Sequence, residues 1–447
     1  MLRASRLAIA AALALMLAAD AGAASKPADK PMTADRPMAA GKAMQADRTV
    51  QAVRASAGFK AALAALEKDQ DRITAETIEL TEIPAPPFKE KAKGLAYMAK
   101  LKALGLDDVE MDAEGNVMGL RRGTGPAGAP LVVIAAHQDT VFPEGTNVKV
   151  RREGTKLYAP GVGDDTRSLA VLLGYVRALD AAKVRTKKDI LFVADVGEEG
   201  PGDLRGMRYL FGKGKYKDRI AAFFSMDGTG ADRVTYGAVG SRRYRVTFKG
   251  PGGHSYGAFG LVNPMAAMGT TVVEMNRIKV PSQPKTTYMT SVVGGGTSVN
   301  SIPDSIWLEV DMRSESAEEL AKVDRRFQEI VKAAVDAENA ARSTRAGKIT
   351  AELKLIGERP TGATREDAEI VQVTAAAVKA AGLTPVLGAS STDSNIPISL
   401  GIPAVTIGSG GEGGRAHAVD EWIDVAPAEA LKGQGVGLSA LLAMAGT

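Results

Sequence analysis

The chain has 447 residues, of which 45% are hydrophobic and 24% charged, so it is long enough to bury more than one hydrophobic core. Its formal net charge is only +4, and its Lys and Arg residues are scattered, which argues against a nucleic-acid-binding surface. It contains no cysteine, which excludes disulfide bridges, thiolate zinc sites and a lipid-anchored leader.

Residues 1–24 have the pattern of a signal peptide. Arg3 and Arg6 precede an apolar stretch at residues 7–19, and small residues follow at 21–23, where a signal peptidase cuts. No segment reaches the roughly 20 apolar residues of a membrane helix. We therefore expect cleavage near Ala23 or Ala24, export to the periplasm or the medium, and no membrane association of the mature chain.

Residues 25–55 are rich in Pro, Ala, Lys and Asp and lack apolar periodicity, so a disordered linker is expected there. Order begins near Phe59, where apolar residues recur at helical spacing. The prolines after Ile83 end this helical region.

Beyond Ile83, predicted strands and helices alternate. The strands are expected at residues 116–120, 131–136, 189–194 and 221–226, and the helices at 167–182 and 203–211. Such alternation predicts an α/β sheet, which binds ligands at the carboxyl ends of its strands.

The pattern changes at about residue 240. Strands at 244–248 and 306–312 and helices at 264–278 and 317–341 predict an α+β insert over residues 240–353. The α/β pattern then resumes with a helix at 367–381 and a strand at 404–407. The first domain, residues 56–239 and 354–447, is therefore interrupted by a second one.

Metal-binding residue types follow the predicted strands. They are His137 and Asp139, Asp164 and Asp165, Glu198 and Glu199, Asp227, and His417 behind a glycine-rich loop. Crowded carboxylates would repel one another without a cation, and imidazole with carboxylate is the usual zinc ligand set when thiolates are absent. These ligands exceed the needs of one open zinc site, so two metal ions are predicted, with zinc as the default and cobalt or manganese also compatible.

Two neighbouring glutamates suggest different roles. One would bind metal, and the other would act as a general base on water activated there. Asp139, two residues after His137, suits a residue that orients the imidazole. The chain has only three histidines, and all of them, His137, His254 and His417, lie at loop sites rich in Gly or Asp.

The ordered motifs AAHQDTV, GVGDDTRS, GEEG, SMDG, GGHS and AHAVDEW resemble those of the co-catalytic zinc exopeptidases, which include tripeptidase T, glutamate carboxypeptidase, aminoacylase and acetylornithine deacetylase. The resemblance covers residues 83–424. It implies a mixed-sheet α/β zinc-peptidase catalytic domain interrupted by a ferredoxin-like lid and dimerisation domain, and a homodimer formed through residues 240–353.

The resemblance also implies roles for individual residues. His137, Asp164 and Asp227 would hold one zinc ion, and Asp164, Glu199 and His417 the other, with Asp164 bridging and the Asp164–Asp165 peptide bond cis. Glu198 would be the base, Asp139 the orienting residue, and His254 would stabilise the oxyanion, often across a dimer. The substrate would be bound by Asn300, Arg313, Asp393 and Asn395.

The sequence departs from this pattern at Thr166. The resembled families have a lysine after the paired aspartates, in DDKGG or DDKAG, whereas this chain has DDTRSLA. Position 166 is not a metal ligand, so the chemistry is unaffected but the packing of the following helix is expected to differ. Asp227, in place of Glu, and the IPAPPF and SSTDSN segments are closest to the tripeptidase T-like branch and favour an aminopeptidase acting on small peptides.

Other interpretations remain open. The same site would serve a carboxypeptidase or a deacylase of N-acyl amino acids, and a non-catalytic binding protein could keep the fold. The presence of Glu198 argues against a non-catalytic protein. The glycines at residues 123–128 precede a strand and contain Pro, which does not suit a dinucleotide site, and Glu421 is expected to be a solvated loop charge.

Overall fold

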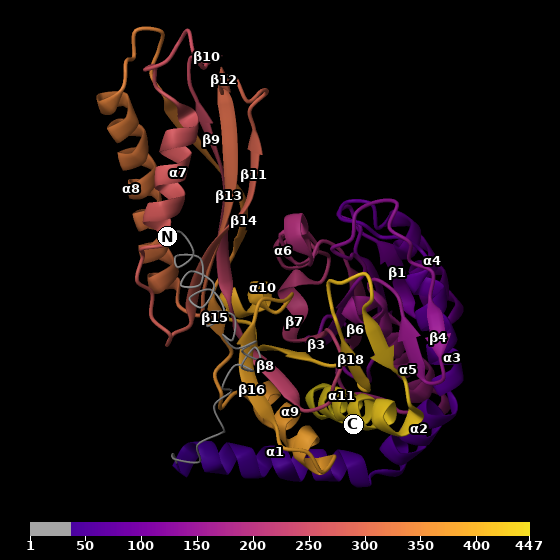
Figure 1. Cartoon of the computed structure of the whole chain (residues 1–447). Helices are drawn as coiled ribbons and strands as arrows, with labels where there is room; N and C mark the ends of the chain where they lie inside the picture. Colours follow the sequence, from indigo (N-terminus) through magenta and orange to yellow (C-terminus); the bar gives the residue numbers. More distant parts are fainter. Residues whose placement is uncertain (1–36) are drawn as a thin grey trace, which may run out of the picture.

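The computed structural model describes residues 37–447, with side chains from residue 41. Figure 1 shows a broad α/β body from which a long, narrow insert projects. The predicted signal peptide, residues 1–24, lies outside the described residues, as does the first part of the predicted linker. Within residues 37–447, no helix has the length and apolar character needed to cross a membrane.

A nine-stranded mixed sheet forms the centre of the α/β body. Its main order is β1-β2-β6-β3-β7-β17-β8-β15, and β16 pairs with β8. The strands are β1 (Asp107–Met111), β2 (Val117–Arg121), β3 (Leu131–His137), β6 (Ile190–Asp195), β7 (Ile220–Met226), β8 (Arg233–Ala238), β15 (Gly362–Ala363), β16 (Val386–Ser390) and β17 (Ala404–Ile407). The neighbours β6, β3, β7 and β17 are parallel, so their carboxyl ends meet at one edge.

The alternation of side chains along β3 explains why this strand is apolar throughout. Val132, Ile134 and Ala136 join the core on one face of the sheet, and Leu131, Val133 and Ala135 join the core on the other. Helices that cover the sheet or connect its strands are α2 (Ala57–Lys68), α3 (Gln70–Thr81), α4 (Lys91–Ala103), α5 (Arg167–Ala181), α6 (Arg205–Gly212), α9 (Glu369–Ala380), α10 (Asn395–Ser399) and α11 (Pro427–Ala445).

The expected linker is wrong for residues 37–55, which form the helix α1 (Pro37–Ala55). Its side chains Ala46, Val50 and Val53 are buried, and the helix packs against α9 and α11. The alanine-rich sequence has good helix propensity but a weak apolar stripe, so its order depends on packing against those distant helices.

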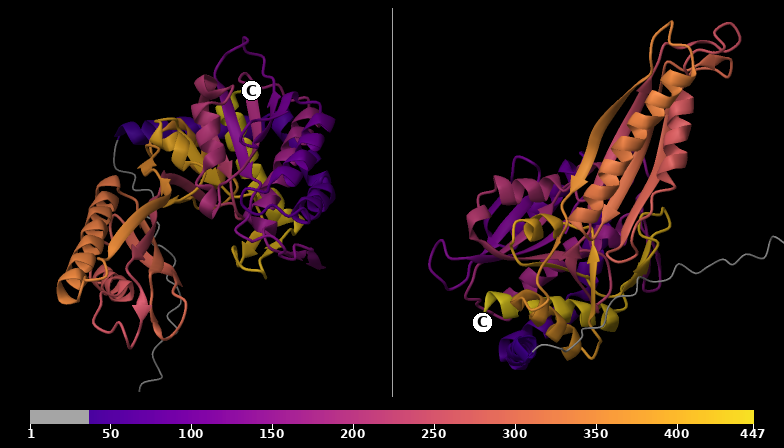
Figure 2. Two further views of the ribbon diagram at one scale, coloured as in Figure 1. Left: turned by 90° about the horizontal axis from the view of Figure 1, so that it is seen from above. Right: turned by 90° about the vertical axis from the view of Figure 1, so that its left-hand side faces the viewer.

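The insert is a four-stranded antiparallel sheet of order β11-β13-β9-β14. Its elements are β9 (Gly240–Lys249), β11 (Thr286–Gly295), β13 (Ser305–Ser314), β14 (Thr350–Arg359), α7 (Pro264–Met275) and α8 (Ala317–Ala341). Figure 2 shows α7 and α8 side by side over one face of this sheet. Since β14 continues to Arg359, the insert ends later than the predicted residue 353.

Two further sheets complete the fold, one at the far tip of the insert and one in the α/β body. The far tip of the insert carries β10 (Gly253–His254) paired with β12 (Ser301–Ile302). A separate sheet of order β18-β19-β5-β4 joins two distant chain segments: β4 (Arg151–Glu153), β5 (Lys156–Tyr158), β18 (Glu412–Gly414) and β19 (Trp422–Asp424). This second sheet holds the loop of His417 beside the loop of Asp164.

Candidate metal centre

The carboxyl edge of the parallel strands gathers the predicted ligands. His137 ends β3, Glu198 and Glu199 follow β6, and Asp227 follows β7. Asp164 lies in the turn before α5 and His417 in the loop between β18 and β19. Ligand atoms lie within 4.8 Å of one another in three sets: His137 with Asp164 and Asp227, Asp164 with Glu199 and His417, and His137 with Glu198 and Glu199. The first two are the sets implied by the sequence resemblance.

Asp164 belongs to the first two sets and points one carboxylate oxygen toward each imidazole. Its Oδ1 is 3.0 Å from His137 Nε2, and its Oδ2 is 3.2 Å from His417 Nε2. His417 Nε2 is also 2.8 Å from Glu199 Oε1. The Asp164–Asp165 peptide bond is cis, as expected. The geometry is that of a carboxylate able to bridge two metal ions.

Charge at this edge of the sheet favours cations. Burial by itself would lower the pKa of His137, but its hydrogen bond to Asp164 and the charges of Asp165, Asp164 and Asp139 raise it well above its usual range. Hydrogen bonds to Asp164 and Glu199 raise the pKa of His417 to about 10. The imidazole and carboxylate atoms therefore fit two divalent metals, which would replace these protons, so metal affinity should fall as pH decreases.

The role of Asp139 differs in detail from the prediction. His137 Nδ1 lies 3.0 Å from the main-chain oxygen of Asp139 but 3.8 Å from its carboxylate. The carboxylate instead accepts hydrogen bonds from the backbone N–H groups of Gly197, Glu198 and Glu199, at 2.8, 3.2 and 2.8 Å. Asp139 thus orients the imidazole through its backbone and fixes the turn of the two glutamates through its side chain.

Glu421 is not a solvated loop charge, contrary to expectation. Its side chain is buried and accepts hydrogen bonds from the backbone N–H groups of Gly161, Gly163 and Asp164, at 2.9, 2.7 and 2.9 Å. Burial raises its pKa to about 7 against the effect of these bonds. The pairing of β19 with β5 brings Glu421 to this loop from 257 residues away.

Glu198 forms an ion pair that sequence analysis missed. Its Oε1 is 2.9 Å from Nη1 of Arg359, the last residue of β14, and Arg359 Nη2 also donates to the Glu198 main-chain oxygen. Burial raises the pKa of Glu198 well above its usual range, while the Arg359 charge opposes that rise. No local motif marks Arg359, because only the return of the chain from the insert places it here.

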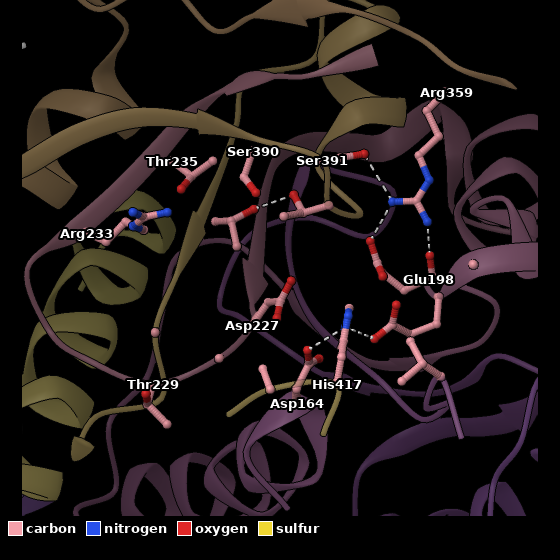
Figure 3. Close-up of a pocket in the computed structure, with 18 of the residues that line it drawn as sticks. Asp164, Glu198, Asp227, Thr229, Arg233, Thr235, Arg359, Ser390, Ser391 and His417 are labelled. Carbon is pink, nitrogen blue, oxygen red and sulfur yellow. Dashed lines mark hydrogen bonds and ion pairs between the residues drawn. The ribbon is translucent and has the colours of Figure 1, made fainter. Parts of the chain in front are cut away.

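A cavity of about 690 Å³ opens over Asp164, Glu199, Asp227 and His417. Figure 3 shows Asp164, Asp227 and His417 on one side of the cavity and Arg359 with Glu198 on another. Cations and hydroxyl groups line the remaining wall: Arg233, Arg243, Arg313, Arg359, Thr229, Thr235, Ser390, Ser391, Thr392 and Thr406. Arg313, which was predicted to contact substrate, is among the lining residues, and its Nε is 2.6 Å from Oδ2 of Asp311. This wall suits an anionic or strongly polar ligand.

The predicted substrate contacts of Asp393 and Asn395 are wrong for this conformation. Both side chains are buried and neither lines the cavity. Asn395 donates to the main-chain oxygens of Val239 and Pro360, where the chain enters and leaves the insert. Burial and the charge of Asp195 raise the pKa of Asp393 well above its usual range. The SSTDSN segment resembles a substrate-binding loop, but in the folded chain the Asp393 and Asn395 side chains are buried. Asn395 supports the two ends of the insert.

His254 and Asn300 are also absent from this cavity. They lie at the far tip of the insert, where the N–H of Ser255 donates to the Asn300 main-chain oxygen and the His254 ring is exposed (Figure 1). The length of the insert separates them from the metal ligands of the same chain. The oxyanion role of His254 and the substrate role of Asn300 therefore cannot be exercised on this chain's own site in this conformation.

The sequence matches a known protein family and a known relative. Residues 133–442 match Peptidase family M20/M25/M40. Carboxypeptidase G2 from Pseudomonas sp. (strain RS-16) is 26% identical over 230 residues, which cover 50% of this chain and 54% of that protein. The chain thus matches about half the length of this curated relative.

Solved structures share the fold. The aminopeptidase PepT from Bacillus cereus ATCC 10987 superimposes with a TM-score of 0.67 at 21% identity, covering 84% of this chain and 99% of that one. The di-peptidase Dug1p from Saccharomyces cerevisiae has a TM-score of 0.68 at 15% identity, covering 87% and 99%. A dinuclear metal-binding peptidase from Bacillus subtilis has a TM-score of 0.60 at 16% identity, covering 84% and 99%.

Proposed function

Because the chain belongs to Peptidase family M20/M25/M40, a family of metallopeptidases, we propose that it is a two-metal exopeptidase that removes the amino-terminal residue from dipeptides and tripeptides. The observation that carries this proposal is the pair of ligand sets joined by Asp164, with Glu198 beside them at the edge of the cavity. Zinc is the metal that this imidazole and carboxylate set favours.

The metal ligands would be His137, Asp164 and Asp227 for one ion and Asp164, Glu199 and His417 for the other. Two such ions supply Lewis acidity, polarise the scissile carbonyl and lower the pKa of water. Asp139 and Glu421 hold the backbone segments that carry Glu199 and Asp164, so the ligands are positioned before metal binds.

Glu198 would accept the proton from the attacking water and return it to the leaving amine. Burial raises its affinity for a proton, and Arg359 moderates that rise and fixes the direction of the carboxylate. A carboxylate whose pKa is raised above its usual range is better suited to take up this proton and then to donate it.

The arginines of the cavity support a short substrate with a free carboxylate. Arg243, Arg313 and Arg359 come from the ends of β9, β13 and β14 that face the α/β body. Guanidinium groups bind carboxylates through paired hydrogen bonds. If one of these arginines binds the carboxyl terminus of the substrate while the metals bind its first peptide bond, the distance between the arginine and the metals limits the length of the peptide.

The alternative function is a carboxypeptidase or N-acyl amino acid deacylase using the same site, and the similarity to carboxypeptidase G2 favours it. The decisive chemical difference is whether the substrate needs a free amino group. We would assay a free tripeptide, an amino-terminally blocked tripeptide, a carboxyl-terminally amidated tripeptide and an N-acetyl amino acid.

We expect cleavage of the free tripeptide only, loss of activity with a chelator, and recovery with zinc. Cleavage of the blocked tripeptide or the N-acetyl amino acid would assign the alternative function. Zinc-loaded protein that cleaves none of the four would contradict both.

We further infer a homodimer in which the partner's insert supplies His254. Two features support it: the exposed ring at the tip of the insert, and the edge strand β11, whose residues Met289, Val292 and Val293 are exposed. An unpaired apolar edge strand is a surface that usually pairs or is covered.

Mixing two inactive variants tests this homodimer. E198Q loses the base and H254A loses the tip imidazole, so a mixed dimer has one site with both groups intact. After subunit exchange, we expect about a quarter of wild-type activity, since half of the dimers are mixed and each has one working site. A monomer in solution, or no recovery in mixed dimers verified by mass, would rule the arrangement out.

We also propose export of the protein after removal of residues 1–24, from the pattern of charged, apolar and small residues alone. Mass spectrometry of the protein from a culture's extracytoplasmic fraction should find a chain beginning near Ala24 or Ser25. An intact Met1 there would contradict the cleavage.

A further inference from the structure

A second cavity, of about 830 Å³, lies in the α/β body away from the metal centre. It opens between α1, α2, the segment of residues 182–187 that leads from α5 to β6, and the end of α11. Lys187 lines it and precedes β6, whereas Glu198 lines the metal cavity and follows β6. The two cavities therefore lie at opposite ends of this strand, and Figure 1 shows α1 and the end of α11 in the lower part of the body.

Cationic side chains gather at this cavity without a partner from the chain. Those that line it are Arg48 of α1 and Lys183, Arg185 and Lys187 of the segment before β6. All four are exposed, and within residues 41–447 their side chains form no ion pair or hydrogen bond. No Asp or Glu side chain of the described residues lines the cavity. A carboxyl group on Thr447, which also lines it, would offset only one of these charges.

The polar groups that flank this segment are already engaged elsewhere. Asp180 Oδ1 accepts hydrogen bonds from Arg121 at 3.1 and 3.0 Å, and Asp189 Oδ2 accepts one from Arg219 at 2.7 Å. Lys188, the next residue along, donates to the main-chain oxygen of Met444 at the end of α11, at 2.8 Å. The chain thus pairs the charges on either side of the cavity and leaves those that line it.

Lys183 stands where the backbone favours glycine. Its φ is 53°, in the left-handed region, and its N–H donates to the main-chain oxygen of Asp180 as α5 ends. A side chain in this conformation costs about 1–2 kcal/mol, so glycine is usual at such a helix end. The charge of a lysine here also stabilises the carboxyl end of α5. That effect accounts for one cation and leaves Arg48, Arg185 and Lys187 unexplained.

The inner wall of the cavity is apolar. Its buried lining residues are Val53, Phe59, Val184 and Leu442, from α1, α2, the segment before β6 and α11. Since these side chains are buried and the four cations are exposed, the cavity has an apolar interior and a cationic rim. An inorganic anion would meet the rim and leave the interior uncovered, whereas an apolar molecule would leave the cations unpaired.

We propose that this cavity is a binding site for a small amphiphilic anion, a molecule in which a carboxylate or phosphate group is joined to an apolar chain. The anionic group pairs with Arg48, Arg185 and Lys187 at the rim, and the chain packs against Phe59 and Leu442. The volume lies within the range of small-molecule sites. The site is independent of the proposed peptidase function, because no residue of the metal centre takes part in it.

The probe is laurate, whose binding to the zinc-loaded full chain would be measured by titration calorimetry below the concentration at which laurate forms micelles. Inorganic phosphate and acetate test the charge alone, and dodecyl maltoside tests the chain alone. Octanoate and decanoate test the length of the chain. Vesicles of phosphatidylglycerol and phosphatidylcholine test whether the anion is recognised on a lipid surface instead.

We expect laurate to bind with a Kd of about 100 µM or less, and phosphate, acetate and dodecyl maltoside to bind at least about tenfold more weakly. Affinity should rise at least about threefold for each two methylene groups from octanoate to laurate, because the apolar wall is covered progressively. Laurate affinity should fall as ionic strength increases, because salt screens the exposed cations.

Two variants locate the site. R185Q/K187Q removes two charges from the rim and should weaken laurate binding at least about fivefold. A52W leaves the charges unchanged and fills the cavity from an exposed position on α1, and it should weaken binding at least about tenfold. K60Q/K68Q, which removes two exposed lysines of α2 outside the cavity, is the control and should match wild type. Peptide hydrolysis should be the same in all of them.

Absence of laurate binding to wild type, or binding to the vesicles without binding of free laurate, would overturn the inference. So would unchanged laurate affinity in R185Q/K187Q or in folded A52W, since laurate would then occupy another site, such as the metal cavity. Equal weakening by K60Q/K68Q would assign the effect to net charge and overturn it as well. If A52W cannot be purified folded, R185Q/K187Q against K60Q/K68Q decides alone. None of these results bears on the peptidase proposal, which rests on hydrolysis and metal content.

Discussion

Replacing Glu198 with Gln should reduce kcat by at least about a hundredfold while two metal ions per chain remain bound. The amide keeps the size of the side chain and its contact with Arg359, which is 2.9 Å from Glu198 Oε1, but it cannot accept a proton from water. The ligand atoms of Glu199, His417 and Asp164 are unchanged by this substitution. The measurement is kcat and metal content on the same purified sample.

The control is E144Q, in which the glutamate side chain is 71% exposed and lies outside the cavity. It should match wild type in both measurements. Turnover of E198Q within a few-fold of wild type, with metal content intact, would show that Glu198 is not the base. A loss of metal from E198Q would instead make Glu198 a ligand, which its proximity to His137 and Glu199 permits.

Replacing Asp164 with Ala should abolish both metal sites and with them the activity. Asp164 contributes one oxygen to each ligand set, at 3.0 Å from His137 Nε2 and 3.2 Å from His417 Nε2. Loss of an outer-shell group costs about 10- to 100-fold in metal affinity, so loss of a bridging ligand should cost more than about a hundredfold at each site.

Metal content by elemental analysis and zinc affinity by chelator competition would measure this effect. D218A, in which the aspartate side chain is 85% exposed, serves as the control. Far-ultraviolet circular dichroism would verify that D164A is folded. A D164A protein that retains two zinc ions would refute the bridging role, and retention of one ion would show that Asp164 serves a single site.

The sequence predicted the catalytic sheet well because its signals are local. A strand buried on both faces must be apolar along its whole length, so residues 131–136 and 404–407 were recognisable without their neighbours. The helix at 317–341 was predicted with its observed ends, because the Ser316 side chain caps its first turn and apolar residues line one face. α1 was missed because its order comes from α9 and α11.

In the candidate site, too, some residues were predicted from local signals, whereas the positions of others depend on the path of the whole chain. His137, Glu198, Glu199 and Asp227 were predicted because parallel strands deliver their last residues to one edge. Asp164 and His417 lie outside the parallel strands, in the turn before α5 and in the loop between β18 and β19, and were recognised from their sequence motifs. Asp393, Asn395, His254 and Asn300 were placed by the resemblance, and the path of the chain takes the first two into the interior and the others to the tip of the insert.

The sequence by itself thus determined which residues can bind metal and which edge of the sheet carries them, since both follow from residue type and strand order. Only the tertiary structure determined which charged side chains lie beside these residues and hold them in place. Arg359 reaches Glu198 across 161 residues, and Glu421 reaches the N–H of Asp164 across 257. Charge compensation in a buried site depends on the distance between the charged groups in space, which cannot be predicted from their separation along the chain.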